Sequence, residues 1–171
     1  TMDEARKQGA IVHLIKANVG DKYEVEKMMN FVKSEVTRLD LIVHCAVFVA
    51  PGGVFDVSYD SWLNALKVGS LSLVEVVKHA LPILQEGSTV IALSSKGATH
   101  AIPKYAALGT PKALTEAIIK YMVPELAPKG IRANVVYAGP LDTEAFRSVF
   151  PNADKLLQSA ERANPTIRNL T

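Results

Sequence analysis

Three side chains near the middle of the sequence have the types and the spacing that acid catalysis requires. Ser95 ends an apolar segment, Tyr105 comes ten residues later, and Lys112 lies seven residues beyond the tyrosine. A tyrosine hydroxyl can donate a proton or a hydrogen bond, a nearby ammonium group lowers the pKa of such a hydroxyl, and a serine can orient a substrate. Each residue alone is more often structural, but together, at the end of an expected strand, they predict a catalytic site.

The place of Lys112 in its expected helix also indicates a role beyond structure. Thr110 is a favourable N-cap and Pro111 a favourable first residue, so we expect a helix from Pro111 to Leu126. Lys112 then lies in the first turn, where a positive charge does not complement the helix dipole. Seven residues of helix rise about 10.5 Å, so Tyr105 and Lys112 are expected to face one cleft rather than to touch.

Polar or small residues follow two other expected strands. Asn18 follows a strand expected at Ala10–Lys16; its side chain could bind the edge of a base, although an asparagine at this spacing is more often a turn residue. Gly139 and Thr143 follow the fourth expected strand. Glycine lets a ligand approach the backbone closely, and Thr143 could cap the next helix or contact a cofactor amide or phosphate.

The neighbouring residues His44 and Cys45 raise the question of a metal site. They lie in a strand expected at Leu41–Ala46, and neighbouring strand residues point to opposite faces, which makes them a poor chelating pair. The sequence contains no CxxC or HxxxH partner motif. We therefore predict no metal site, and we interpret this segment as a surface of small side chains along which a flat ligand could lie.

The elements that must position these residues alternate between apolar strands and amphipathic helices. Strands are expected at Ala10–Lys16, Leu41–Ala46, Thr89–Leu93 and Ile131–Tyr137, helices at Asp21–Thr37, Ser61–Leu84 and Pro111–Leu126, the end of a helix at Met2–Gln8, and two short helices within Asp142–Arg162. This alternation predicts an α/β fold with a doubly wound parallel sheet in three α/β/α layers, formed by residues 1–171 as a single domain. Ligands of such sheets bind at the carboxyl ends of the strands.

Composition excludes several other classes of function. The chain has 171 residues, 49% hydrophobic and 21% charged, with a net charge of +2 and interspersed acids and bases, so we expect neither nucleic acid nor a membrane as a partner. The single cysteine, Cys45, favours a reducing, cytoplasmic setting. The sequence lacks the GxSxG, Walker A and HExxH motifs, and also the glycine-rich turn that binds pyrophosphate.

In their order along the chain, these segments resemble the short-chain dehydrogenase/reductase family, whose Rossmann-type fold the resemblance implies here. The parallels include Ala17-Asn18-Val19, Ser94-Ser95-x-Gly97, the Tyr/Lys pair and Asn134–Thr143. The Tyr-x6-Lys spacing is similar to that of the enoyl-acyl-carrier-protein reductases. Lys16–Gly20 and the tail residues Phe150-Pro151-Asn152, Ala163-Asn164-Pro165 and Arg168 resemble the NADPH-dependent type III group.

The resemblance implies a role for each matching residue. Tyr105 would hydrogen-bond the thioester carbonyl of an enoyl substrate carried on acyl carrier protein, Lys112 would hold the ribose of NADPH (or NADH), and Ser95 would lie beside the substrate. The remaining cofactor contacts would come from Asn18, Val19, Ala46, Gly139, Leu141 and Thr143. The helices within 143–163 would cover the acyl chain.

Two departures bear on the choice of reaction. The residue four positions before Lys112, where most of the family has its tyrosine, is Leu108, and the family's asparagine on the central helix falls near Gly69, which cannot anchor a water relay. Both speak against a ketoreductase or alcohol dehydrogenase. A catalytically silent dinucleotide-binding protein stays open as a third interpretation, since the turn motifs are eroded.

The family's strand order, 3-2-1-4-5-6-7, makes a further prediction about this chain. The strands expected at Ala10–Lys16 and Leu41–Ala46 would be the third and fourth, and the two strands that belong between them are not in the sequence, nor is the last one. We therefore expect a fragment of a larger polypeptide, in which 10–16 does not pair directly with 41–46. The wide apolar faces of the helices expected at Ser61–Leu84 and after Lys112 suggest subunit contacts, and the family resemblance implies a homotetramer formed through them.

Overall fold

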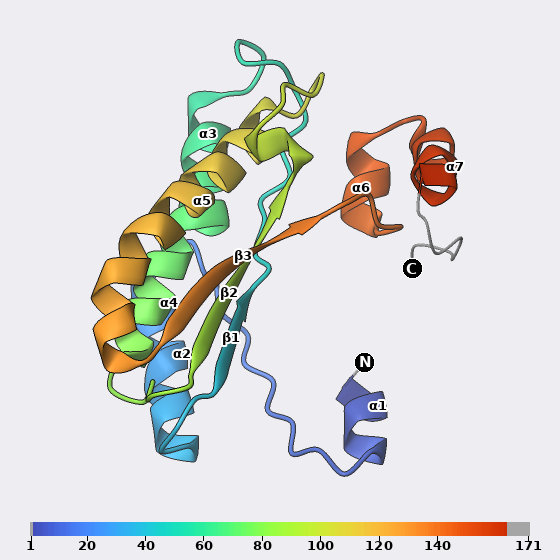
Figure 1. Ribbon diagram of the computed structural model, residues 1–171. Helices are drawn as coiled ribbons and strands as arrows, with labels where there is room; N and C mark the ends of the chain where they lie inside the picture. Colours follow the sequence, from blue (N-terminus) through green and yellow to red (C-terminus); the bar gives the residue numbers. More distant parts are fainter. Residues whose placement is uncertain (1, 164–171) are drawn as a thin grey trace.

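A computed structural model describes residues 2–163, and its centre is a three-stranded parallel sheet (Figure 1). The strands β1 (Leu41–His44), β2 (Thr89–Ser95) and β3 (Arg132–Ala138) lie in the order β1-β2-β3. Each strand is paired in parallel with the next, with Leu41 opposite Thr89 and Thr89 opposite Arg132. The prediction of a parallel, Rossmann-type α/β fold is confirmed. The predictions on Asn164, Pro165 and Arg168 lie outside the described residues.

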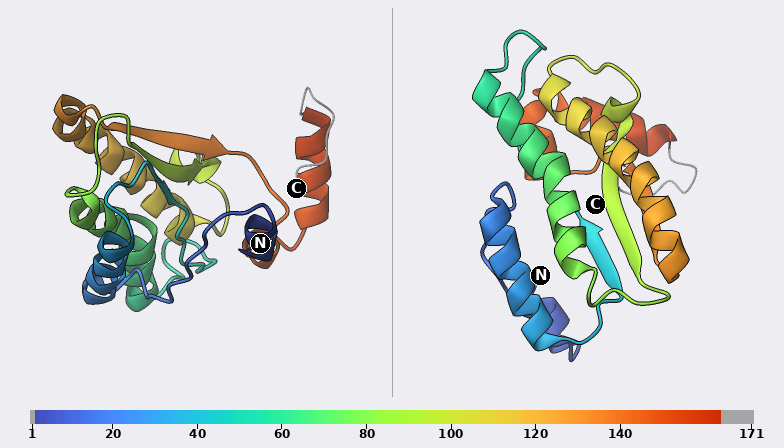
Figure 2. Two further views of the ribbon diagram at one scale, coloured as in Figure 1. Left: turned by 90° about the horizontal axis from the view of Figure 1, so that it is seen from below. Right: turned by 90° about the vertical axis from the view of Figure 1, so that its left-hand side faces the viewer.

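Three helical units pack on one face of this sheet, as the right-hand view of Figure 2 shows. They are α2 (Lys22–Glu35), the unit α3 (Tyr59–Leu66) with α4 (Ser72–Ala80), and α5 (Ala106–Leu126). The helix α2 begins where predicted, because the side chain of Asp21 accepts a hydrogen bond from the backbone N–H of Tyr23 at 2.8 Å. No helix among the described residues is both long and apolar enough to cross a membrane.

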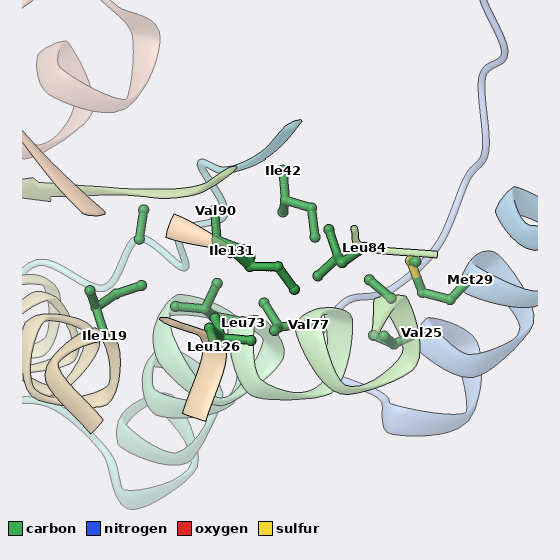
Figure 3. Packing of buried hydrophobic residues seen from close by; sticks show 12 residues of the cluster. Val25, Met29, Ile42, Leu73, Val77, Leu84, Val90, Ile119, Leu126 and Ile131 are labelled. Carbon is green, nitrogen blue, oxygen red and sulfur yellow. The ribbon is translucent and has the colours of Figure 1, made fainter. Parts of the chain in front are cut away.

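The core lies between the sheet and these helices (Figure 3). Val25 and Met29, one helical turn apart on α2, pack with Leu73 and Val77 of α4 against Val90 of β2. Val25, Leu73 and Val90 are completely buried. On the opposite face of the sheet, Leu41, Val43 and Val136 are 43–50% exposed, so within residues 2–163 only one face carries a sealed core.

The long helix predicted at Ser61–Leu84 is interrupted by a π-helical segment, Lys67–Leu71, between α3 and α4. In this segment Gly69 lies against α5, where an added Cβ would come within 3.0 Å of Pro111 Cβ. Ser70 Oγ donates to the carbonyl of Pro111 at 2.7 Å, and Thr115 Oγ1 donates to the carbonyl of Gly69 at 3.0 Å. The helices thus meet through backbone groups, which explains the small residue at this position.

The helix α5 begins at Ala106, five residues before the predicted start at Pro111. The prediction was wrong because local N-cap signals at Thr110 and Pro111 were outweighed by packing: Gly109 lies so close to Gly97 that a Cβ on it would be 2.5 Å from the Gly97 carbonyl oxygen. Lys112 is consequently in the second turn of the helix, not in the first.

The strand predicted at Ala10–Lys16 is not formed. This segment has no regular secondary structure, and its apolar side chains Ile11 and Leu14 are 90% and 75% exposed. A strand needs a neighbour for its backbone groups, and the described chain offers none beside it; 10–16 does not pair with β1. Before it, α1 (Met2–Lys7) ends near Gly9, which has the left-handed φ of +84° expected of a helix terminus.

The tail forms two short helices on the other side of the sheet from α5 (Figure 1). They are α6 (Glu144–Val149) and α7 (Ala153–Ala163), separated at Pro151 as predicted. Arg147 joins them, donating to both carboxylate oxygens of Asp142 at 2.6 and 2.8 Å and to Asp154 at 3.0 Å. These hydrogen bonds hold the pKa of Asp142 below its usual value and raise that of Arg147.

Candidate active site

The structure brings Ser95 and Tyr105 together at the carboxyl end of β2. Ser95 is the last residue of that strand, and Tyr105 directly precedes α5. Their hydroxyl oxygens are 3.3 Å apart, which is longer than a strong O–H···O hydrogen bond. Both side chains are partly exposed, so a substrate oxygen could reach both hydroxyls.

Tyr105 is held in place from several sides. The backbone N–H of Gly52 donates to the carbonyl of Lys104 at 3.0 Å, and the N–H of Ala106 donates to the carbonyl of Gly52 at 3.4 Å. The tyrosine ring lies so close to Gly97 that a Cβ there would be 2.5 Å from it. From the tail, the ring of Phe150 stacks on Tyr105 with centroids 5.9 Å apart and planes 16° apart.

A groove of about 600 Å³ opens beside this tyrosine. Its lining includes Gly52, Gly97, Thr99, Pro103 and Tyr105, which come from the two loops that follow β1 and β2. Loops at the carboxyl ends of parallel strands are where this type of sheet binds its ligands. A ligand in this groove would therefore contact Tyr105.

Lys112 lies behind this pair, in the interface between α5 and the sheet. The residue is buried, with 8% of its surface accessible to solvent, and its ammonium group donates to the backbone carbonyl of Leu93 at 2.8 Å. Burial lowers the pKa of Lys112, while the nearby Cys45 acts in the opposite direction. No hydrogen bond joins Lys112 to Tyr105 within the described part of the chain.

Sequence reasoning considered His44 only as a metal ligand and missed its place in this site. His44 ends β1 on the covered face of the sheet, is 7% exposed, and its Nε2 lies 2.7 Å from Ser72 Oγ. Burial, and secondly the charge of Lys112, lower the pKa of His44 to about 4. The spacing of His44 two residues after the apolar Ile42 in an expected strand was the sequence signal that could have placed both on one face.

The residues predicted to bind the cofactor lie in two places. Asn18 and Val19 line a groove of about 600 Å³ together with Val68 and Leu71 of the π-helical segment. The side-chain oxygen of Asn18 accepts a hydrogen bond from the N–H of Gly20 at 3.0 Å, so this residue also forms the turn that the sequence allowed.

The second group follows the ends of β1 and β3. Ala46 is half-buried just beyond β1, while Gly139 and Leu141 are exposed beyond β3. A Cβ on Gly139 would have no atom within 4 Å, so its backbone is open to a ligand. Thr143 caps α6, its hydroxyl accepting from the N–H of Phe146 at 3.1 Å. A flat, extended dinucleotide fits this set of small residues and exposed backbone.

A parallel α/β sheet with serine, tyrosine and lysine gathered at the end of its middle strand defines a partial Rossmann domain of the short-chain dehydrogenase/reductase type. The family model described as enoyl-(acyl carrier protein) reductase matches residues 1–171. The chain therefore belongs to the enoyl-acyl-carrier-protein reductase family.

Individual relatives agree with this assignment. The chain is 32% identical over 162 residues to the NADH enoyl-[acyl-carrier-protein] reductase FabI of Enterococcus faecalis, covering 92% of this chain and 64% of that protein. It is 30% identical over 158 residues to FabI of Nostoc sp., covering 90% of this chain and 61% of that protein. The chain thus spans about three fifths of the length of these curated relatives.

Solved structures show the same fold. The Bacillus cereus enoyl-acyl carrier protein reductase, determined with NADP+ and indole naphthyridinone, matches with a TM-score of 0.87 and 27% identity, covering 97% of this chain and 66% of that one. The NADH enoyl-[acyl-carrier-protein] reductase of Aquifex aeolicus matches with a TM-score of 0.84 and 25% identity, covering 97% of this chain and 66% of that one.

Proposed function

We propose that the full-length protein containing this chain reduces the C2–C3 double bond of an enoyl thioester in fatty-acid synthesis. The observation that carries the proposal is the meeting of Ser95 and Tyr105 beside an open groove, with Lys112 buried behind them. The match of the enoyl reductase family along the whole chain supports the same reaction.

The nicotinamide cofactor would supply a hydride to C3 of the substrate. The residues of the chain would do the rest: the Tyr105 hydroxyl would donate a hydrogen bond to the thioester oxygen, where negative charge develops, and Ser95 would orient that oxygen. Lys112 would hold the ribose of the cofactor and supply positive charge. A proton from solvent water would then add to C2, which would complete the saturated thioester.

NADPH is the proposed cofactor, with NADH as the alternative. The Tyr-x6-Lys spacing and the tail residues resemble the NADPH-dependent type III group, and the Bacillus cereus relative was solved with NADP+. The names of the Enterococcus and Nostoc relatives specify NADH, so both cofactors belong in any assay. Asn18, Val19, Ala46, Gly139, Leu141 and Thr143 are the proposed contacts.

The proposed partner is acyl carrier protein, which the family name specifies as the carrier of the substrate. We further propose a cytoplasmic homotetramer in which α4 and α5 contribute subunit contacts. Light scattering on the full-length protein tests the oligomer directly, and a monomer would contradict it.

The reaction is tested by following the oxidation of NADPH and of NADH with crotonyl and acetoacetyl thioesters side by side. We expect turnover of the crotonyl substrate alone, severely reduced in Tyr105→Phe and unchanged in Tyr59→Phe, a control at an exposed tyrosine 76% accessible to solvent. Turnover of acetoacetyl thioester would instead indicate a ketoreductase. Cofactor binding without either activity would indicate a silent dinucleotide-binding protein.

A further inference from the structure

His44 has one ring nitrogen that the described chain does not satisfy. Its Nε2 lies 2.7 Å from Ser72 Oγ, and that hydroxyl donates its hydrogen to the carbonyl of Val68, also at 2.7 Å. Because a serine hydroxyl has a single hydrogen, Ser72 must accept from His44, and Nε2 must carry the proton. The tautomer of the neutral ring is therefore fixed, with an unprotonated Nδ1.

This Nδ1 atom is buried, and no described residue donates a hydrogen bond to it. A buried acceptor without a donor costs about 1–3 kcal/mol, and buried water molecules commonly satisfy such atoms. His44 pairs with Ala92 across the sheet, and the next residue along β2, Leu93, is the one whose carbonyl accepts from Lys112, so the ammonium group lies near the ring on the covered face. Of its three N–H donors, Lys112 gives one to Leu93 within the described chain, at 2.8 Å.

Two backbone carbonyls of the π-helical segment each already accept a hydrogen bond from a side chain. Gly69 has no side chain, and its carbonyl accepts from Thr115 Oγ1 at 3.0 Å. The carbonyl of Val68 accepts from Ser72. His44 Nδ1 is the buried side-chain acceptor left free in this part of the described chain.

We propose that His44 is a positioning residue of the active site: its Nδ1 accepts a hydrogen bond from a water molecule that in turn accepts one from the Lys112 ammonium. The chain from Val68 through Ser72 to His44 fixes the ring, and the water fixes the direction of the ammonium group. This inference rests on the proposed function, because it assigns His44 to the reaction in which Lys112 acts.

Two substitutions separate the nitrogens of the ring. His44→Gln places an amide N–H near the position of Nε2 and keeps the donor to Ser72, but it offers no acceptor at Nδ1. His44→Asn places an amide oxygen near the position of Nδ1 and loses the bond to Ser72. In the full-length protein we expect kcat for crotonyl thioester to fall about tenfold in His44→Gln, because the water that orients the Lys112 ammonium loses its acceptor. His44→Asn should keep kcat within about threefold while its Tm falls further than that of His44→Gln.

A purely structural role predicts a different pattern, in which kcat stays at the wild-type value in His44→Gln or follows Tm in both variants. Either result would overturn the proposal.

A second readout does not depend on activity. In the full-length protein labelled with 15N-histidine at pH 7, the resonances of His44 should show a protonated Nε2 and an unprotonated Nδ1 that accepts a hydrogen bond. A protonated Nδ1, or one with the shift of a free nitrogen, would refute the proposal. Wild-type protein that does not reduce crotonyl thioester would contradict the proposed function instead, and the NMR result would then stand on its own.

Discussion

Replacing Gly97 with alanine should disable the site by moving a single ring. The new Cβ would lie 2.5 Å from both Cδ1 and Cε1 of Tyr105 and 3.3 Å from the Cα of Gly109. Ordinary carbon contacts are about 3.5–4.0 Å, so the ring must retreat by about 1 Å. A displacement of this size at a reacting group costs up to about 100-fold in rate, and overpacking at such a site costs about 1–3 kcal/mol of stability.

The assay is a double-mutant cycle on the full-length protein, with kcat for crotonyl thioester measured in wild type, Gly97→Ala, Tyr105→Phe and the double variant. If Gly97→Ala acts by displacing the Tyr105 hydroxyl, it should cost little further rate once that hydroxyl has been removed. Urea unfolding of each variant separates loss of rate from loss of folded protein. A full, additive loss of rate in the double variant would refute the reasoning.

Three further perturbations test other parts of the structure. Burial lowers the pKa of His44 to about 4 from an ordinary 6.5. The contribution of the neutral ring to the free energy of unfolding is therefore complete above about pH 6.5 and falls by at most about 3 kcal/mol as the pH approaches 4. Urea titrations from pH 7.5 to 4 should show a weaker acid dependence in His44→Gln, and identical curves would contradict the assignment. Gly69→Ala would place a Cβ 3.0 Å from Pro111 and should cost about 1–3 kcal/mol of stability. An unchanged urea midpoint would show that the π-helical segment and α5 can move apart there without cost. Arg147→Ala removes the three hydrogen bonds to Asp142 and Asp154 and should speed proteolytic cleavage between α6 and α7 with little change in Tm; cleavage at the wild-type rate would show that these exposed ion pairs do not order the tail.

Strand ends and alternating elements allowed the centre of the fold and the Ser95–Tyr105 pair to be predicted from the sequence. Parallel strands bring their carboxyl ends to one edge, so residues that follow β2 had to lie near that edge. The start of α5 was not predictable from Thr110 and Pro111, because these local N-cap signals do not report the close approach of Gly109 to Gly97. Likewise, the apolar run at Ala10–Lys16 has the composition of a strand but no neighbour to pair with.

The role of His44 illustrates a different limit of sequence reasoning. The structure places it on the covered face of β1, and its tautomer depends on Ser72 and Val68, which lie at and within the π-helical turn between α3 and α4. Nothing in the apolar spacing of that helix distinguishes a π turn from a continuous α-helix, so this contact could be found only in three dimensions.

The central claim, that the site delivers a hydride to an enoyl thioester, is tested most directly by isotope transfer. The full-length protein is incubated with NADPH deuterated on the transferable position, or with NADH labelled in the same way, together with crotonyl thioester, and the product is analysed by mass spectrometry and NMR. The account predicts butyryl thioester with a single deuterium at C3. Unreacted crotonyl thioester, alongside deuterated 3-hydroxybutyryl thioester from an acetoacetyl control, would contradict it.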